Sequence, residues 1–302
     1  MDLIAEFRKT VDILRSNLIL FLPALIVFYL IPVALLVAAV YIFTPIIIVA
    51  LKSPFPVQIL FQGSLLGLGI IIILGVLVYV YVTSGSANMY KQSVLAGRTS
   101  INDFWEGCRK YFGKILGGFI LFAIVYGIIM LVGLILSAAV ILPGILKLTA
   151  SRAMPGPPVR IAEAERYAGF AAWLIELFRV ISDVIGVWLL LATISGFIFI
   201  FTLFWIQALV VDEVGTIRAI RTSISFVRKN FKTTLGVASL WIIAQGFTHA
   251  IFPGGGMGGG GPSYGYGVGF PPPLQAVFQL LIATFFTLLL YTVYAGRTGK
   301  IQ

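Results

Sequence analysis

The sequence has little charge and few of the side chains that catalytic and metal sites use. Only 11% of its 302 residues are charged, and there is one histidine and one cysteine. A single cysteine excludes an intrachain disulfide and a thiolate metal site. No set of acid, base and nucleophile can be assembled from the remaining residues. We therefore predict a protein that is not an enzyme and that uses no metal or cofactor.

Hydrophobic sequence takes the place of those groups. Hydrophobic residues make up 60% of the chain and the mean hydropathy is +1.05, whereas a soluble domain has about 45–50% apolar and about 25% charged residues. A helix needs about 20 apolar residues to cross a bilayer. The predicted fold class is therefore all-α, a polytopic membrane bundle. Six runs meet this length, near residues 18–43, 60–83, 115–142, 185–211, 233–252 and 274–294.

Two of the apolar runs are longer than one crossing requires. The first contains Pro23, Pro32 and Pro45, and each proline removes a backbone hydrogen bond. We expect a kinked span there, followed by an interfacial stretch near residues 44–58. The third run continues past Pro143, where we expect its helix to stop.

The distribution of basic residues predicts the orientation of the chain. With six spans, both termini and the segments 84–114 and 212–232 lie on one side. That side holds 15 of the 21 Lys and Arg residues and should be cytoplasmic by the positive-inside rule. The net charge of +10 is thus mainly a topology signal, and nucleic acid is not an expected partner. Localisation in the plasma membrane follows.

An internal repeat is indicated by the tetrapeptide Ala-Gly-Arg-Thr, which occurs at residues 96–99 and again at 295–298. The cytoplasmic segments also align with one another when Arg15, Arg109 and Arg228 are superposed. Apolar or thiol side chains then stand eight, four and one residues before each arginine and three after it, the spacing of one helix face. These twelve residues are Phe7, Val11, Leu14 and Leu18; Ile101, Trp105, Cys108 and Phe112; and Ile220, Ile224, Val227 and Phe231.

The alignment predicts one membrane domain, residues 1–302, built from three parallel hairpin repeats. Each repeat has a cytoplasmic amphipathic helix, an outward span, an external loop and a returning span. Ser100 and Asp103 resemble a capping box that begins the second of these helices. The pseudo-repeats are residues 1–99, 100–216 and 217–302.

The amphipathic helices have two interpretations. They could be the cytoplasmic ends of long spans, buried against neighbouring helices. In the favoured interpretation they lie in the headgroup layer, with basic residues near anionic lipid and the apolar stripe in the acyl boundary. The lipid-interface candidates are Arg15, Trp105, Arg109, Lys110, Arg221, Arg228 and Lys229.

Two neighbouring stretches resemble a known motif. AIRTSISFVRKNFKTTLG at residues 219–236, after WIQALVVDEVG at 205–215, is similar to a motif of several prokaryotic six-span families. These are the membrane domain found beside some glycerophosphodiester phosphodiesterases, the YciC-like inner-membrane proteins, and archaeal relatives. The resemblance implies a six-span membrane fold and an archaeal relative of these proteins. It implies no activity, and with one histidine and no cluster of acidic residues we do not expect a phosphodiesterase domain in this sequence.

Polar residues inside the spans suggest two functions. None of the spans carries Asp, Glu, Lys or Arg in its interior, and the intramembrane polar candidates are Gln207, Gln245 and Gln279. One hypothesis is a lipid-interacting or scaffolding protein whose partners are membrane lipids and a membrane or cytoplasmic protein. The alternative is a carrier or channel for a small neutral or amphiphilic solute, such as a lipid. A cavity lined by the glutamines would favour the carrier, and a closed core would favour the scaffold.

Several local features receive structural interpretations. The Gly-rich segment 253–273 is expected to be a flexible external loop, and residues 159–181 an amphipathic helix on the outer surface. Gly113 and Gly117 fit a small-residue contact between helices. Cys108 is expected to be a small buried residue. Asp212 and Glu213 mark the end of the fourth span, near the basic residues Arg218 and Arg221.

Overall fold

The structure is a computed structural model that describes residues 3–52, 57–152, 162–251 and 272–300. Every regular element in these ranges is helical, which confirms the all-α prediction for the described part of the chain. The chain forms two compact units. Unit 1 comprises residues 1–118 and 201–302, and unit 2 comprises residues 119–200.

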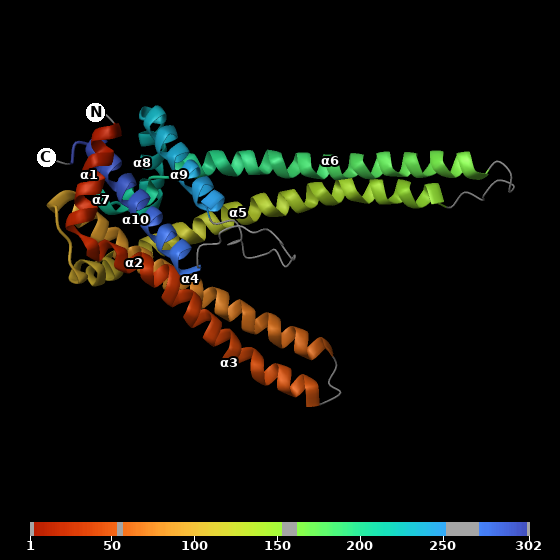
Figure 1. Ribbon diagram of the computed structural model, residues 1–302, viewed down its shortest axis with the longest axis horizontal. Coiled ribbons are helices and arrows are strands. Elements are labelled where there is room, and N and C mark those ends of the chain that lie inside the picture. Colours follow the sequence, from red (N-terminus) through yellow and green to blue (C-terminus); the bar gives the residue numbers. More distant parts are fainter. Residues whose placement is uncertain (1–2, 53–56, 153–161, 252–271, 301–302) are drawn as a thin grey trace. The chain divides into compact units, whose positions relative to one another are not determined.

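Twelve helical elements follow one another along the described residues (Figure 1). In chain order they are α1 (Leu3–Ser16), the 3-10 helix η1 (Leu18–Leu20), α2 (Phe21–Leu25), the π-helix η2 (Ile26–Leu30), α3 (Ile31–Lys52), α4 (Val57–Ala96), α5 (Ile101–Arg152), α6 (Ala162–Thr202), α7 (Trp205–Val211), α8 (Thr216–Lys229), α9 (Phe231–Ile251) and α10 (Pro272–Arg297).

Four helical segments among the described residues are long and apolar enough to cross a membrane. The chain is therefore compatible with a membrane protein. The predicted spans near residues 18–43 and 233–252 are not among the four and stay predictions. The four segments are Gly67–Ala96, Ile101–Leu146, Trp173–Val211 and Gln275–Arg297.

The prolines interrupt the helices less than expected. A π-helix, η2, lies between Pro23 and Pro32, where a kink was predicted. The prediction of a helix end at Pro143 was wrong, because α5 continues to Arg152. α3 continues past Pro45 to Lys52, and the interfacial stretch near residues 44–58 stays a prediction. A helix able to span a membrane tolerates a proline, because neighbouring helices, Ser or Thr side chains and local 3-10 or π turns can satisfy the backbone group that the proline leaves unpaired.

The external segments also differ from the sequence-based picture. We predicted a separate surface helix over residues 159–181, but α6 is one helix from Ala162 to Thr202 and includes the span that follows. The Gly-rich segment 253–273 lies outside the described residues up to residue 271. Pro272 and Pro273 form the first turn of α10, a position where proline is tolerated because its missing N–H would be unpaired.

The three amphipathic segments join the helices that follow them in two ways. α1 and α8 each end next to an asparagine, Asn17 and Asn230, whose side-chain amide donates a hydrogen bond to the carbonyl four residues earlier. Such bonds compete with the helix backbone and favour a helix end. Tyr111 occupies the aligned position in α5, offers no such bond to its own backbone, and α5 continues without a break.

The core of unit 1 forms around α10. Its residues Leu288, Leu289, Tyr291 and Tyr294 are almost fully buried, and α10 contacts α1, α2, α4, α7 and α9. In the most apolar 18-residue stretch of α10, 44% is buried inside the protein, compared with only 6% in the corresponding stretches of α5 and α6. α10 is thus the central helix of unit 1.

The close helix contacts use glycines other than the predicted pair. A Cβ atom on Gly113 would meet nothing within 4 Å, whereas one on Gly107 would lie 2.7 Å from the backbone oxygen of Ser84 in α4. Within unit 2, a Cβ on Gly133 of α5 would lie 2.6 Å from Leu191 of α6. Gly107 and Gly133 therefore let α5 approach its neighbours in the two units.

Candidate functional site at the ends of α4, α5, α7 and α10

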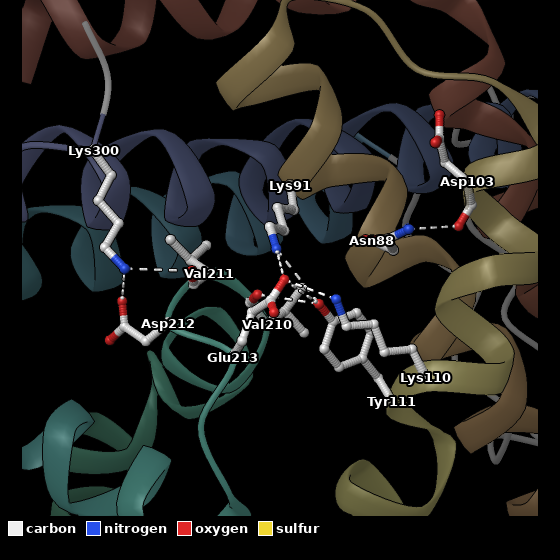
Figure 2. Close-up of polar contacts among 10 residues, drawn as sticks. All are labelled: Asn88, Lys91, Asp103, Lys110, Tyr111, Val210, Val211, Asp212, Glu213 and Lys300. Atoms are coloured by element: carbon white, nitrogen blue, oxygen red, sulfur yellow. Dashed lines mark hydrogen bonds and ion pairs between the residues drawn. The ribbon is translucent and has the colours of Figure 1, made fainter.

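An acidic pair, Asp212 and Glu213, lies in the short connection between α7 and α8 of unit 1. Glu213 has φ +55°, the one positive φ at a residue other than glycine in the described part of the chain. This left-handed conformation is unfavourable for a side chain with a Cβ. It directs the two neighbouring carboxylates to different partners (Figure 2).

The Glu213 carboxylate is held by donors from two other helices. Its Oε1 accepts hydrogen bonds from the Lys91 Nζ of α4 at 2.6 Å, the Lys110 Nζ of α5 at 2.8 Å and the Tyr111 hydroxyl at 3.4 Å. The Lys110 and Lys91 ammonium groups stabilise the charged form and lower the pKa of the Glu213 carboxyl to about 2. The carboxylate is therefore charged throughout the physiological pH range.

The Asp212 carboxylate contacts the end of α10. Lys300 Nζ lies 2.5 Å from Asp212 Oδ1, and the Tyr294 hydroxyl donates a hydrogen bond to Oδ2 at 2.5 Å. Gly299 has φ +72° and ends α10 with a bond from the Lys300 N–H to the Ala295 carbonyl at 3.0 Å, as in a Schellman motif. This turn places Lys300 over Asp212.

Two further contacts join α1 to the ends of α10 and α4. Arg297 Nε lies 3.4 Å from the Glu6 carboxylate, which is buried. The Asn17 side chain donates to the Gly97 carbonyl and accepts from the Thr99 N–H, both at 3.1 Å. Together with the acidic pair, these contacts connect segments from all three predicted pseudo-repeats.

Sequence reasoning missed the partners of the acidic pair. Arg218 and Arg221, the nearby basic residues in the sequence, are exposed and in none of the ion pairs among the described residues. Lys91 and Lys300 take their place from distant parts of the chain. The available signal was a lysine close to a tyrosine at the end of an apolar run: Lys91 follows Tyr90, and Lys300 lies six residues after Tyr294. Only the fold shows that the ends of these two runs lie near Asp212 and Glu213.

The predicted lipid-interface residues occupy exposed positions. Trp105 is 51% exposed and packs edge-on against Phe104. Lys110 belongs to the Glu213 cluster, which the sequence did not predict. The remaining residues are exposed and absent from the ion pairs among the described residues: Arg15, Arg109, Arg221, Arg228 and Lys229.

The face of each amphipathic helix that packs against protein lies beside the predicted apolar stripe. Phe7, Leu18, Ile101 and Phe231 of the stripe are 42 to 70% exposed, while Cys108 and Val227 are buried. Buried or half-buried residues recur five and two residues before the aligned arginines and two after them. They are Thr10, Ile13 and Asn17; Phe104, Gly107 and Tyr111; and Ser223, Phe226 and Asn230.

The structure does not bring the three predicted glutamines together. Gln207 is buried in α7, five residues before Asp212, which bonds to Tyr294 of α10. Gln279 lies fifteen residues before Tyr294 on α10, about 22 Å along a helix that rises about 1.5 Å per residue. Gln245 is half-buried in α9. Neither the hollow lined by residues 102–110 of α5 nor the one lined by residues 4–12 of α1 includes any of the three.

The fold and these contacts define an all-helical protein with helices able to span a membrane and a polar network at one end of unit 1. The chain belongs to the family described as Domain of unknown function (DUF7847), whose model matches residues 1–295. Comparisons with curated proteins and with solved structures found no match. The resemblance to the phosphodiesterase membrane domain and the YciC-like proteins stays a prediction.

Proposed function

We propose that the protein is a lipid-interacting or scaffolding protein of the plasma membrane, without catalytic activity, that crosses the membrane six times with both termini in the cytoplasm. Its three amphipathic segments lie in the cytoplasmic headgroup layer. Their basic residues contact anionic lipid phosphates, and their apolar stripes enter the acyl boundary. The partners are membrane lipids and a protein that docks on the same surface.

The observation that carries this proposal is the division of each amphipathic segment into three faces. One face packs against unit 1, a second carries the apolar stripe, and a third is basic and exposed. Five stripe residues are exposed, Phe7, Leu18, Ile101, Trp105 and Phe231, and the others are half-buried or buried. In α5, these faces are represented by Phe104, Trp105 and Arg109. A helix that only capped a long span would bury its apolar stripe, whereas an interfacial helix keeps that stripe for lipid.

The proposed repeat is supported by the aligned burial and by the helix ends. The same register positions face the core in α1, α5 and α8, and Asn17 and Asn230 make the same backward bond. The tetrapeptide itself is weaker support, since Gly97 ends α4 with φ +74° while Gly296 lies inside α10. We base the repeat on the segments and not on the tetrapeptide.

The described core favours the scaffold over the carrier. Aromatic and aliphatic side chains from α4, α7 and α10 close the centre of unit 1. Met89, Phe204, Leu209, Leu288 and Tyr291 are all less than 2% exposed. A solute path would need a continuous opening between these helices.

The test is native mass spectrometry of the full chain extracted in a mild detergent from a membrane of known lipid composition. The variant combines Arg109→Gln, Arg221→Gln and Arg228→Gln, one exposed arginine from α5 and two from α8. Each such residue contributes about 1 kcal/mol to contact with anionic lipid. We expect wild type to retain anionic lipids and the triple variant to lose most of them.

Arg179→Gln on α6 is the matched control, because Arg179 is exposed and lies in unit 2. It should retain anionic lipids as wild type does. Equal retention by wild type and the triple variant would contradict the lipid role. A protein that copurifies in stoichiometric amount with wild type but not with the triple variant would show that this surface contacts a protein partner, as a scaffold would. Solute uptake by vesicles that contain the purified chain would instead support the carrier.

A further inference from the structure

Two ammonium groups and the Tyr111 hydroxyl, which also contacts the Val210 carbonyl at 3.4 Å, converge on one oxygen atom of Glu213. The Lys91 ammonium, the Lys110 ammonium and the Tyr111 hydroxyl all reach Oε1, at 2.6, 2.8 and 3.4 Å (Figure 2). Lys91 also donates a hydrogen bond to the Tyr111 hydroxyl at 3.5 Å. Two ammonium groups and a hydroxyl around one anionic oxygen are a donor set suited to a phosphate group, which offers more oxygens and more charge than a carboxylate.

The donors belong to the helices α4 and α5, whereas the carboxylate belongs to the connection between α7 and α8. Tyr111 is fully buried in α5, and the Lys91 side chain is 11% exposed in α4. Glu213 lies in the connection after α7, with a side chain that is 48% exposed and a φ of +55°. A strained, solvent-accessible residue can leave the cluster, while the helices keep the donors in place.

We propose that Lys91, Lys110 and Tyr111 form a binding site for a phosphate group, and that the Glu213 carboxylate occupies this site as an internal ligand until a phosphate displaces it. A largely buried ammonium such as Lys91 requires an anion, and the displacement exchanges one anion for another. Asp212 does not compete, because it is paired with Lys300 and Tyr294. Two lysines match a phosphate that carries two negative charges.

The phosphate has two possible sources, a lipid headgroup or free phosphate in solution. The lipid source rests on the proposed function, since Lys110 is 39% exposed on the helix that carries the interface candidates Trp105 and Arg109. The soluble source does not depend on it. Lys110 was left unchanged in the arginine variant above, so a failure of the lipid role and a failure of this site are distinguishable.

The experiment measures binding to the purified full chain and to its variants Glu213→Gln and Glu213→Gly. One arm titrates inorganic phosphate in an uncharged detergent by calorimetry. The other measures phosphatidic acid bound in phosphatidylcholine nanodiscs. An internal ligand reduces apparent affinity by the fraction of sites that are open, so removal of the carboxylate should raise phosphate affinity roughly tenfold. Glu106→Gln, an exposed site on α5 with the same charge change, should leave affinity unchanged.

Each outcome decides the proposal. Tighter binding by the Glu213 variants in either arm supports the site, and the arm that shows it identifies the source of the phosphate. Adding Lys91→Met to these variants must abolish the increase in affinity. The proposal is overturned if Glu106→Gln increases phosphate affinity equally, or if neither Glu213 variant increases it. If both Glu213 variants unfold because Lys91 lacks an anion, phosphate should restore folding better than chloride at equal ionic strength. Failure of that rescue also overturns the proposal.

Discussion

Lys91 and Lys110 pair with the same carboxylate from different surroundings. The Lys91 side chain is 11% exposed and that of Lys110 is 39% exposed. An exposed ion pair contributes about 0–1 kcal/mol to stability, whereas loss of the partner of a buried charge is far more costly. Most of the structural importance of Glu213 therefore comes from Lys91, and Lys110 remains available for exchange with solvent or lipid.

The pH dependence of stability should reflect the lowered pKa of Glu213. Its pKa falls from 4.5 in the unfolded chain to about 2 in the fold. The stabilisation is thus complete above about pH 4.5 and is lost as the pH falls toward 2. We expect the difference in thermal midpoint between wild type and Glu213→Gln to be constant from pH 7 to about 5 and then to shrink. Scanning fluorimetry in detergent measures it.

Glu106→Gln provides the comparison for that experiment. Glu106 is exposed on α5 and belongs to none of the ion pairs among the described residues. Its difference from wild type should therefore be small at every pH. A Glu213→Gln difference that persists undiminished near pH 3 would contradict the ion-pair assignment.

At the scale of the element, the amphipathic segments show which features the spacing of apolar residues predicts and which it does not. Four-three-four spacing predicted amphipathic segments that fall mainly on α1, α5 and α8. The hydrogen bond from the Ser100 N–H to Asp103 at 2.7 Å is one half of the predicted capping box at the start of α5. The pattern did not distinguish the face against protein from the face left uncovered, because both carry apolar residues. Thr10 and Ser223 are buried although polar, and only packing reveals that.

Helix continuity was the least predictable property. Proline suggested a helix end at Pro143 that does not occur. A break does occur between α6 and α7, where no proline stands. There the Ser223 hydroxyl of α8 accepts a bond from the Phe204 N–H at 3.2 Å and donates one to the Phe201 carbonyl at 3.0 Å. A side chain from another helix thus satisfies the open turn, and such tertiary partners are invisible in a local pattern.

The contact between α4 and α5 should be intolerant of side-chain bulk. A Cβ atom on Gly107 would lie 2.7 Å from the Ser84 backbone oxygen and 2.6 Å from the Asn88 Cβ. Gly107→Val should destabilise the fold by about 1–3 kcal/mol, the range for overpacking. The measurement is the denaturant midpoint of the purified chain.

Gly113→Val tests whether that loss comes from contact and not from the change of residue type. Gly113 lies on the same helix, and a Cβ there would meet nothing within 4 Å. Valine should be neutral or slightly stabilising at this position, because glycine is a poor helix former. Equal losses at Gly107 and Gly113 would show that α4 does not approach α5 as described.

At the scale of the whole molecule, the polar contacts of unit 1 connect residues near the starts and ends of its helices. Glu6 near the start of α1 pairs with Arg297 at the end of α10. Lys91 near the end of α4 meets Glu213 after α7. If the helices cross a membrane, these points share one side of it, and the assignment of that side to the cytoplasm stays a prediction. Composition and basic-residue counts suggested that side, but not the network, whose partners are up to 291 residues apart (297 minus 6).

The orientation predicts which positions a membrane-impermeant thiol reagent reaches in intact cells. Cys108 is buried and donates to the Tyr81 carbonyl at 3.3 Å, so it is first replaced by serine. A cysteine at exposed Asn102, beside the start of α5, should label only after the cells are opened. One at Gly258, in the predicted external loop, should label in intact cells. Labelling of Asn102→Cys in intact cells, or protection of Gly258→Cys, would reverse the orientation. The basic helices and the Glu213 cluster would then lie on the outer surface, where the proposed contact with cytoplasmic anionic lipid could not occur.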